Sequence, residues 1–161
     1  MKFFGKYRGK VEQNLDVENR GRIQVSVPAV LGAGRMSWAM PSVPMAGIQA
    51  GFYAVPPRNA NVWVEFEGGN PDYPIWTGCF WGIGETPSLA LVPPSPTAHI
   101  LLQTTGQNTI HINDGGPTLG IQLKSGASIL QIGPDGIKIT AAKIEINGLT
   151  IINQGALTVT P

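Results

Sequence analysis

The sequence predicts an all-β protein made of two parts with different cores. Glycine and proline are abundant, at 21 and 14 of 161 residues, while charged residues make up only 13%. Short segments of alternating apolar and polar residues, separated by turn residues, recur along the chain, as is typical of strands. All four Trp, three Tyr and five Phe lie before residue 85. The second half must therefore build any core from aliphatic side chains alone.

The first half has the pattern of a small barrel. The segments KYRGKVEQN and RIQVSVP flank a polar turn, and Ile23, Val25 and Val27 share one face of the second segment. Three further strands are expected at GFYAVP, NVWVEFEGG and IWTGCFWG, with a long excursion over residues 28–51 before them. Five such strands favour a closed barrel, because closure removes the exposed strand edges.

A proline-rich segment separates the two halves. It reads GETPSLALVPPSPTAHI, and its four prolines exclude a regular helix and favour an extended connector. The predicted parts are the barrel, the linker and the repeat domain, over residues 1–84, 85–98 and 99–161.

The second half is a repeat of short strands. Its segments are NTIHIND, GIQLKS, SILQIG, GIKIT, KIEIN, LTII and ALTVT, and each places Ile, Leu or Val on one side and polar residues on the other. Apolar residues also recur every seven positions from Leu123 to Ile151, which suggests a coiled coil. The sequence GPDG at residues 133–136 breaks any helix there, so the repeat predicts a β-solenoid instead.

The number of strands favours a solenoid wound from three chains. One chain would complete little more than two coils of about 4.8 Å each and would leave both apolar ends open. Three intertwined chains would make a shaft of roughly 30–35 Å with nearly every strand edge paired. We therefore predict an obligate homotrimer with a triple-stranded β-helix. The residues predicted for its core are Ile110, Ile112, Ile121, Leu123, Leu130, Ile132, Ile137, Ile139, Ile144, Ile146, Ile151, Leu157 and Val159.

In order and spacing, these segments resemble the baseplate spike proteins of contractile injection machines, which include phage baseplate assembly protein V and the VgrG proteins of type VI secretion. Residues 9–28 are similar to the family's opening hairpin, and residues 38–47 and 51–82 to its oligonucleotide/oligosaccharide-binding (OB) barrel. Residues 104–140 resemble the start of its triple-stranded β-helix. The resemblance implies a five-stranded OB-fold barrel followed by an intertwined β-helix, in a structural, membrane-piercing needle at the tip of the inner tube.

The resemblance also implies where the protein works and what it meets. Expected partners are two further copies of the chain, the tube or hub proteins of the baseplate, and the target cell envelope on firing. The N-terminus, MKFFGKYRGK, lacks the apolar run of a secretory signal. We therefore expect assembly in the cytoplasm into a phage-tail-like particle, from which the spike is ejected.

The C-terminal end is expected to bind a separate cap. Some spikes of this family end in a His-x-His pair that binds iron, but His99 and His111 are twelve positions apart, so no metal site is expected. No charged residue follows Glu145 to protect the open strand edges. Members of the family carry PAAR-repeat tips, so the resemblance implies that a PAAR-like tip protein covers these edges. The predicted cap contacts are Leu149, Ile151, Leu157 and Val159.

No residue pattern predicts catalysis, a cofactor or a metal site. His111 is expected on the exposed polar side of its strand, and Cys79 in the core without a histidine to activate it. The acidic residues Glu65, Glu67 and Asp72 are expected on a solvated barrel face and not as catalytic carboxylates.

Two other functions fit parts of the sequence. An OB-fold protein that binds single-stranded nucleic acid would stack bases on Trp63, Trp76, Trp81 and Phe66. The net charge of +1 provides no basic groove, so we expect no specific nucleic acid and assign these aromatics to core or inter-subunit packing. A β-solenoid acyltransferase or carbohydrate-active enzyme would need six-residue repeats or converging carboxylates, whereas the spacing here is seven.

Overall fold

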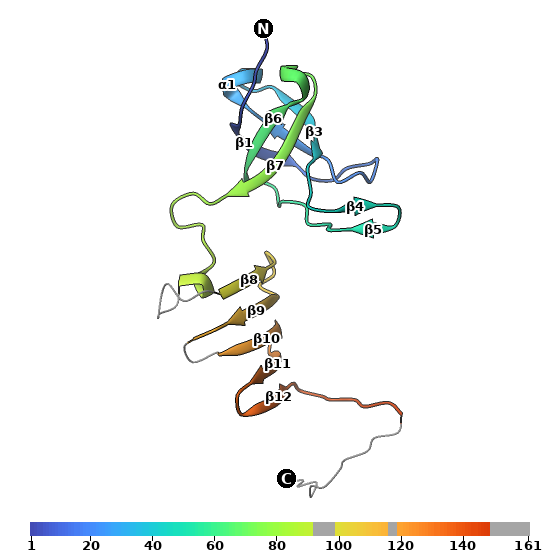
Figure 1. Ribbon diagram of the computed structural model, residues 1–161, viewed down its shortest axis with the longest axis vertical. Helices are drawn as coiled ribbons and strands as arrows, with labels where there is room; N and C mark the ends of the chain where they lie inside the picture. Colours follow the sequence, from blue (N-terminus) through green and yellow to red (C-terminus); the bar gives the residue numbers. More distant parts are fainter. Residues whose placement is uncertain (92–98, 116–118, 149–161) are drawn as a thin grey trace, which may run out of the picture. The chain divides into compact units, whose positions relative to one another are not determined.

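The computed structural model describes residues 1–91, 99–115 and 119–148, and the chain divides into two compact units, Met1–Thr86 and Pro87–Pro161 (Figure 1). The fold is all-β, as predicted. Among the described residues, helical structure is limited to three short segments, which are α1 (Pro28–Leu31), η1 (Glu67–Gly69) and η2 (Ser88–Leu91).

The first unit contains a closed five-stranded barrel, which confirms the predicted architecture. The strand order is β1-β2-β3-β7-β6, and only the β3–β7 pair is parallel. The barrel strands are β1 (Tyr7–Gln13), β2 (Ile23–Ser26), β3 (Met36–Pro41), β6 (Asn61–Phe66) and β7 (Pro74–Phe80).

The barrel encloses its own core. Alternate residues of each strand point inward, as the two-residue period of a strand requires. Ile23, Val25 and Val27 share one face as predicted, and this face points inward, since all three are fully buried. Trp76 is also buried, and its indole N–H donates a hydrogen bond of 3.2 Å to the carbonyl oxygen of Gly21. The core residues are Val11, Ile23, Val25, Val27, Ala39, Val62, Val64, Phe66 and Trp76.

The third barrel strand differs from the prediction. The barrel uses β3 (Met36–Pro41), whereas the sequence indicated GFYAVP at residues 51–56. Strand β3 has a weak apolar alternation because its buried residue, Ala39, is small and lies between Trp38 and Met40. Of this segment, Gly51 ends a separate hairpin of two very short strands, β4 (Ala46–Gly47) and β5 (Ala50–Gly51), and residues 52–56 follow it outside any strand.

A buried carboxylate shapes the loop between β1 and β2. Asp16 accepts hydrogen bonds from the backbone N–H groups of Glu18, Arg20 and Arg22. The Arg22 guanidinium also donates to Asp16 at 2.8 Å, and it holds the pKa of that carboxyl well below its usual range. The polar turn seen in the sequence is thus a fixed structure, because one side chain satisfies three backbone donors.

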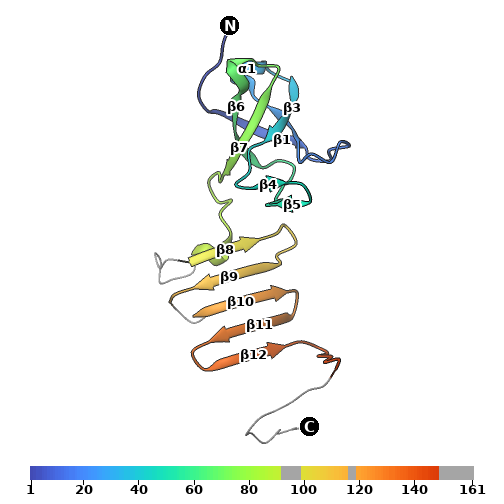
Figure 2. The ribbon, with the colours of Figure 1, turned by 45° about the vertical axis from the view of Figure 1, so that its right-hand side comes forward.

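The second unit contains a five-stranded antiparallel meander in which each strand pairs with the next (Figure 2). These strands pair within one chain, whereas the sequence predicted pairing with neighbouring chains. Two-residue connections after β10 and β11 account for the difference, because such short loops join antiparallel neighbours directly. The strands are β8 (His99–Gln103), β9 (Thr109–Asn113), β10 (Gly120–Ser125), β11 (Ser128–Gly133) and β12 (Gly136–Thr140).

The proline-rich segment is not wholly extended. Residues Ser88–Leu91 form the 3-10 helix η2, in which the Ala90 N–H donates to the Pro87 carbonyl oxygen at 2.9 Å. Proline disfavours a helix interior, but here Pro87 precedes the helix and its missing N–H is not needed. The expectation of a helix-free connector is therefore wrong for these four residues.

Candidate trimer interface

One face of the β8–β12 sheet is dominated by aliphatic side chains, with the Ser125–Ser128 pair at its edge. The cross-strand pairs place ten of them in two columns that run across all five strands. The first column is made only of isoleucine, and its members are Ile100, Ile112, Ile121, Ile132 and Ile137. The second column is Leu102, Ile110, Leu123, Leu130 and Ile139.

This aliphatic face is open in the single chain. Nine of its ten side chains are exposed, by fractions from 37% for Ile112 to 70% for Ile137. A contiguous apolar surface of this kind marks a protein interface, because leaving it in water costs free energy and favours aggregation. The face therefore needs another protein surface to cover it.

The opposite face of the sheet is largely polar. Direct cross-strand neighbours there include a central column of Leu101, His111, Gln122, Gln131 and Lys138. The two faces of the sheet thus have opposite characters.

His111 is an exception on the polar face. The alternation correctly predicts its side of the strand, but the residue is 5% exposed and not open to solvent as expected. Its ring meets that of His99 edge-on, with centroids 5.6 Å apart. Burial, with a smaller contribution from His99, lowers the pKa of His111. Its Nε2 and the Thr109 hydroxyl are buried without a hydrogen-bond partner in the described part of the chain.

The predicted core residues fall into three groups. Those from Ile110 to Ile139 are brought together on the aliphatic face. Ile144 and Ile146 lie after β12, outside any strand, and are exposed, so the strand expected at KIEIN is not formed in the single chain. The remaining predicted core and cap-contact residues, Leu149, Ile151, Leu157 and Val159, lie outside the described residues.

Two members of the face were missed by sequence reasoning. Ile100 and Leu102 belong to β8, which adds a fifth strand to the sheet next to β9. The signal was available, since these residues alternate with His99 and Gln103, but Leu101 between them obscures the pattern.

Side chains expected elsewhere on the barrel are also located. Trp76 and Phe66 are in the core, whereas Trp81 is exposed. Cys79 is exposed instead of buried, because it lies one residue from the end of β7.

The barrel's outer surface also carries an aromatic stack. Trp63 packs against Phe80 with ring centroids 4.8 Å apart, and the Arg8 guanidinium lies over both rings. Trp63 is therefore already engaged within the chain.

The described residues contain neither a cluster of metal ligands nor a helix that could span a membrane. No group of three or more His, Cys, Asp or Glu residues is close enough to hold a metal ion anywhere in residues 1–91, 99–115 and 119–148. No helix in this part of the chain is long and apolar enough to cross a membrane.

Comparison with known families gives each unit a match. Residues 7–81 match the type VI secretion system/phage-baseplate injector OB domain, and residues 99–158 match the phage baseplate V C-terminal trimerisation domain. The chain belongs to the phage baseplate V family of spike proteins. Among curated proteins, none matches the chain significantly.

The two family matches correspond to the two units of this baseplate V-type chain. The injector OB domain covers all five barrel strands, and the trimerisation domain covers all five strands of the sheet. An open aliphatic face in a unit of the trimerisation family supports a homotrimer. Both families are structural parts of a baseplate.

Proposed function

We propose that this chain forms, as a homotrimer, the central spike of a contractile injection baseplate. The single observation that carries the proposal is the ten-residue aliphatic face, which is uninterrupted by any polar side chain and open in one chain. Three such sheets with their aliphatic faces turned inward would enclose one dry core and present polar faces to water. The predicted division into a barrel (1–84), a linker (85–98) and a needle (99–161) belongs to this proposal.

The free energy available from such a core is large. Covering a half-exposed aliphatic side chain stabilises by about 1 kcal/mol, so ten of them give roughly 10 kcal/mol per chain before the cost of association. Because no other described segment of the chain covers that face, folding of this unit and assembly of the trimer would be coupled.

The proposed spike acts mechanically. It sits at the tip of the inner tube, and contraction drives it into the target cell envelope. A core of this kind suits that role, because deforming the shaft would expose aliphatic surface and break many backbone hydrogen bonds together. The proposal includes cytoplasmic assembly into a phage-tail-like particle and ejection on firing, with no enzymatic activity.

Two partners outside the trimer complete the proposal. The barrel would contact the tube or hub proteins of the baseplate, and the C-terminal residues 149–161 would bind a PAAR-like tip protein. The three-chain β-helix remains a prediction for the chain after β12, because the strands up to β12 pair within one chain. Deleting residues 149–161 should abolish co-purification of the cap from the native particle while the barrel stays folded.

Sedimentation equilibrium tests the central claim. The purified chain should have a mass near three times 17.1 kDa at all practical concentrations. A well-folded monomer would overturn the proposed spike. Negative-stain images of the same sample should show particles with one narrow end, and globular particles would contradict a needle.

A further inference from the structure

The barrel unit contains an exposed segment with no charge. From Met36 to Pro57 the sequence holds no Asp, Glu, Lys or Arg, although charged residues make up 13% of the chain. Barrel strand β3, of which only Ala39 is buried, forms the first part of this stretch. After β3 come residues 42–57, of which residues 42–55 are here named the arm. Its middle portion, residues 44–54, is exposed at every position.

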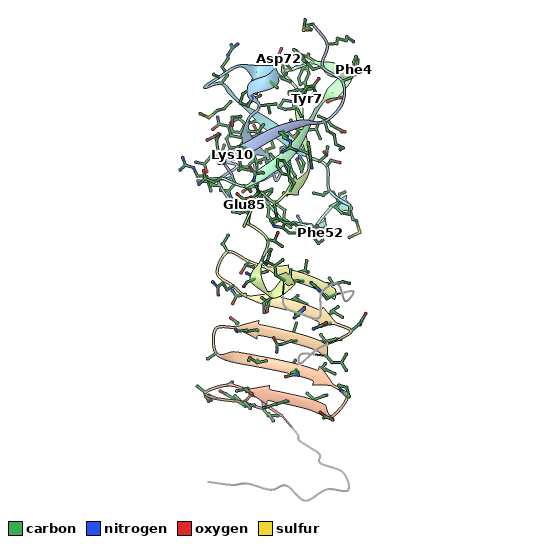
Figure 3. All side chains as sticks on the ribbon, turned by 90° about the vertical axis from the view of Figure 1, so that its left-hand side faces the viewer. Phe4, Tyr7, Lys10, Phe52, Asp72 and Glu85 are labelled. Carbon is green, nitrogen blue, oxygen red and sulfur yellow. The ribbon has the colours of Figure 1, made fainter. Side chains whose placement is uncertain are left out.

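The arm is a defined hairpin that projects from the barrel (Figure 1). Strands β4 and β5 pair antiparallel, and the Phe52 N–H donates to the Met45 carbonyl oxygen at 2.9 Å. Gly51 is needed beneath this contact, since its φ is +156° and a Cβ there would lie 2.9 Å from the Met45 carbonyl oxygen. Figure 3 shows Phe52 on this projecting hairpin.

Large apolar side chains of the arm are left in water. Ile48 at the tip is 98% exposed, and the others are Met45, Phe52 and Tyr53. A recess of about 510 Å³ lies beside them, lined by arm residues and by Arg20, Pro41 and Trp76 of the barrel. Two-residue strands form a hairpin that is marginal in water, so contacts beyond the hairpin must help to hold it.

The composition of the arm matches the centre of a permanent interface. Charged residues are depleted at such centres, and aromatic residues and methionine are enriched. Obligate interfaces between copies of one chain are also more apolar than transient ones. An uncharged, apolar arm is therefore better suited to a partner that never leaves than to one met only on firing.

We propose that the arm packs against the barrel of a neighbouring copy within the homotrimer. This inference rests on the proposed function, because the trimerisation unit is covalently joined to each barrel and holds three barrels at high effective concentration. Around a three-fold axis, each barrel gives one arm and receives one. Such head-to-tail contacts close into a ring without requiring the arm to pair with itself.

Alkylation of a thiol at the arm tip tests whether it is covered. The chain would carry Ile48→Cys in a Cys79→Ser background, because Cys79 is itself an exposed thiol. The matched control is Asp72→Cys in the same background, since Asp72 is exposed in the β6–β7 turn on the same barrel. In the native full-length protein, maleimide should react at position 48 about tenfold more slowly than at position 72. In denaturant the two rates should become equal.

A photo-crosslinker identifies what covers the tip. With p-benzoylphenylalanine at position 48, illumination should give covalent dimers and trimers whose crosslinks map to residues 1–86 of another copy. A sedimentation mass of three chains with rapid alkylation and no interchain crosslink would overturn the arm contact but leave the proposed spike intact. Crosslinks only to a different baseplate protein would also overturn it. A monomeric chain would overturn both proposals.

Discussion

The barrel and the β8–β12 sheet are built from strands with the same alternation of apolar and polar residues. The apolar side of the strands is buried in the barrel and exposed in the sheet. In the barrel, inward residues such as Ile23 and Val64 meet one another and are fully buried. In the sheet, residues of the same type, such as Ile121 and Ile137, face solvent. Closure makes the difference, because a barrel covers its own face and an open sheet does not. Alternation therefore indicates which side of a strand is apolar, while topology decides whether one chain can cover it.

The largest effect is expected from a charge on the aliphatic face, which tests whether this face is covered in the trimer. In the single chain, Ile137 and its neighbour Lys138 are both exposed, so the chain alone predicts that Ile137→Asp and Lys138→Asp are equally tolerated. In the trimer, Ile137→Asp would place three unpaired carboxylates in an aliphatic core, at several kcal/mol each. We expect it to abolish the trimer in sedimentation equilibrium.

Lys138→Asp is the matched control, because Lys138 pairs with Gln131 on the polar face. It should keep the trimer and change the melting temperature little. Equal loss of the trimer in both variants, or in neither, would show that the aliphatic face is not the interface.

The next largest effect is expected inside the barrel. Ile23→Ala removes a fully buried side chain and should lower the free energy of unfolding of the barrel by about 2–5 kcal/mol. Because all tryptophans lie in the barrel unit, their fluorescence reports on its unfolding separately from the sheet. The trimer should persist, since the sheet is unchanged.

Gln24→Ala provides the comparison for the barrel variant. Gln24 is the next residue of β2 and lies on the opposite side of the strand, only partly buried. Its replacement should leave the fluorescence transition within about 0.5 kcal/mol of the parent. If Ile23→Ala dissociated the trimer as fully as Ile137→Asp, the stability of the barrel and the assembly of the trimer would not be independent.

Sequence periodicity was sufficient for four of the five barrel strands. It failed for β3, because Ala39 contributes too little apolar signal between Trp38 and Met40. The expectation that Cys79 is buried rested on the usual behaviour of free cysteine, which carries no information on where a strand end leaves the barrel interior. At small core residues and at strand ends, the local sequence pattern therefore does not predict whether a side chain is buried.

For the candidate interface, the sequence indicated the face but not the pairing. The alternation places residues from Ile110 to Ile139 on one side, and the structure agrees. Whether the strands pair within a chain or between chains depends on turn geometry, which the repeat interval of seven does not reveal. The burial of His111 could not be predicted from the sequence either, since it depends on residues of neighbouring strands that pack around it.

A smaller effect is expected from pH between about 5.5 and 7.5, where the titration of a buried histidine in the sheet unit changes its stability. Because the folded state lowers the pKa of His111, the unfolded chain binds a proton below its ordinary value of about 6.5 while the folded chain does not. Stability should therefore fall as pH drops below about 6.5, and level off below the folded pKa. Far-UV circular dichroism melts across this range measure the effect at constant protein concentration.

His111→Gln should remove most of this pH dependence. His99→Gln should remove less, because burial and not the neighbouring imidazole is the larger cause of the lowered pKa. The barrel's fluorescence transition should show no slope from these groups, since both histidines lie in the second unit. A parent protein that is more stable at pH about 5.5 than at about 7.5 would contradict the assignment.

The smallest expected effect concerns the outside of the barrel. The Arg8 guanidinium lies 5.4 Å from the Trp63 ring centroid and 5.1 Å from that of Phe80, and such exposed cation–π contacts contribute about 0.5–1 kcal/mol. Arg8→Ala should lower the barrel's stability by that amount and change its tryptophan emission. Arg8→Lys should recover only part of it, because an ammonium keeps the charge but not the planar stacking. The sheet has no Phe, Tyr or Trp for an arginine to stack on, so its melting transition and the trimer mass should stay unchanged. Loss of the trimer on Arg8→Ala would place this surface at a contact between copies and remove the distinction between a self-sufficient barrel and a dependent sheet.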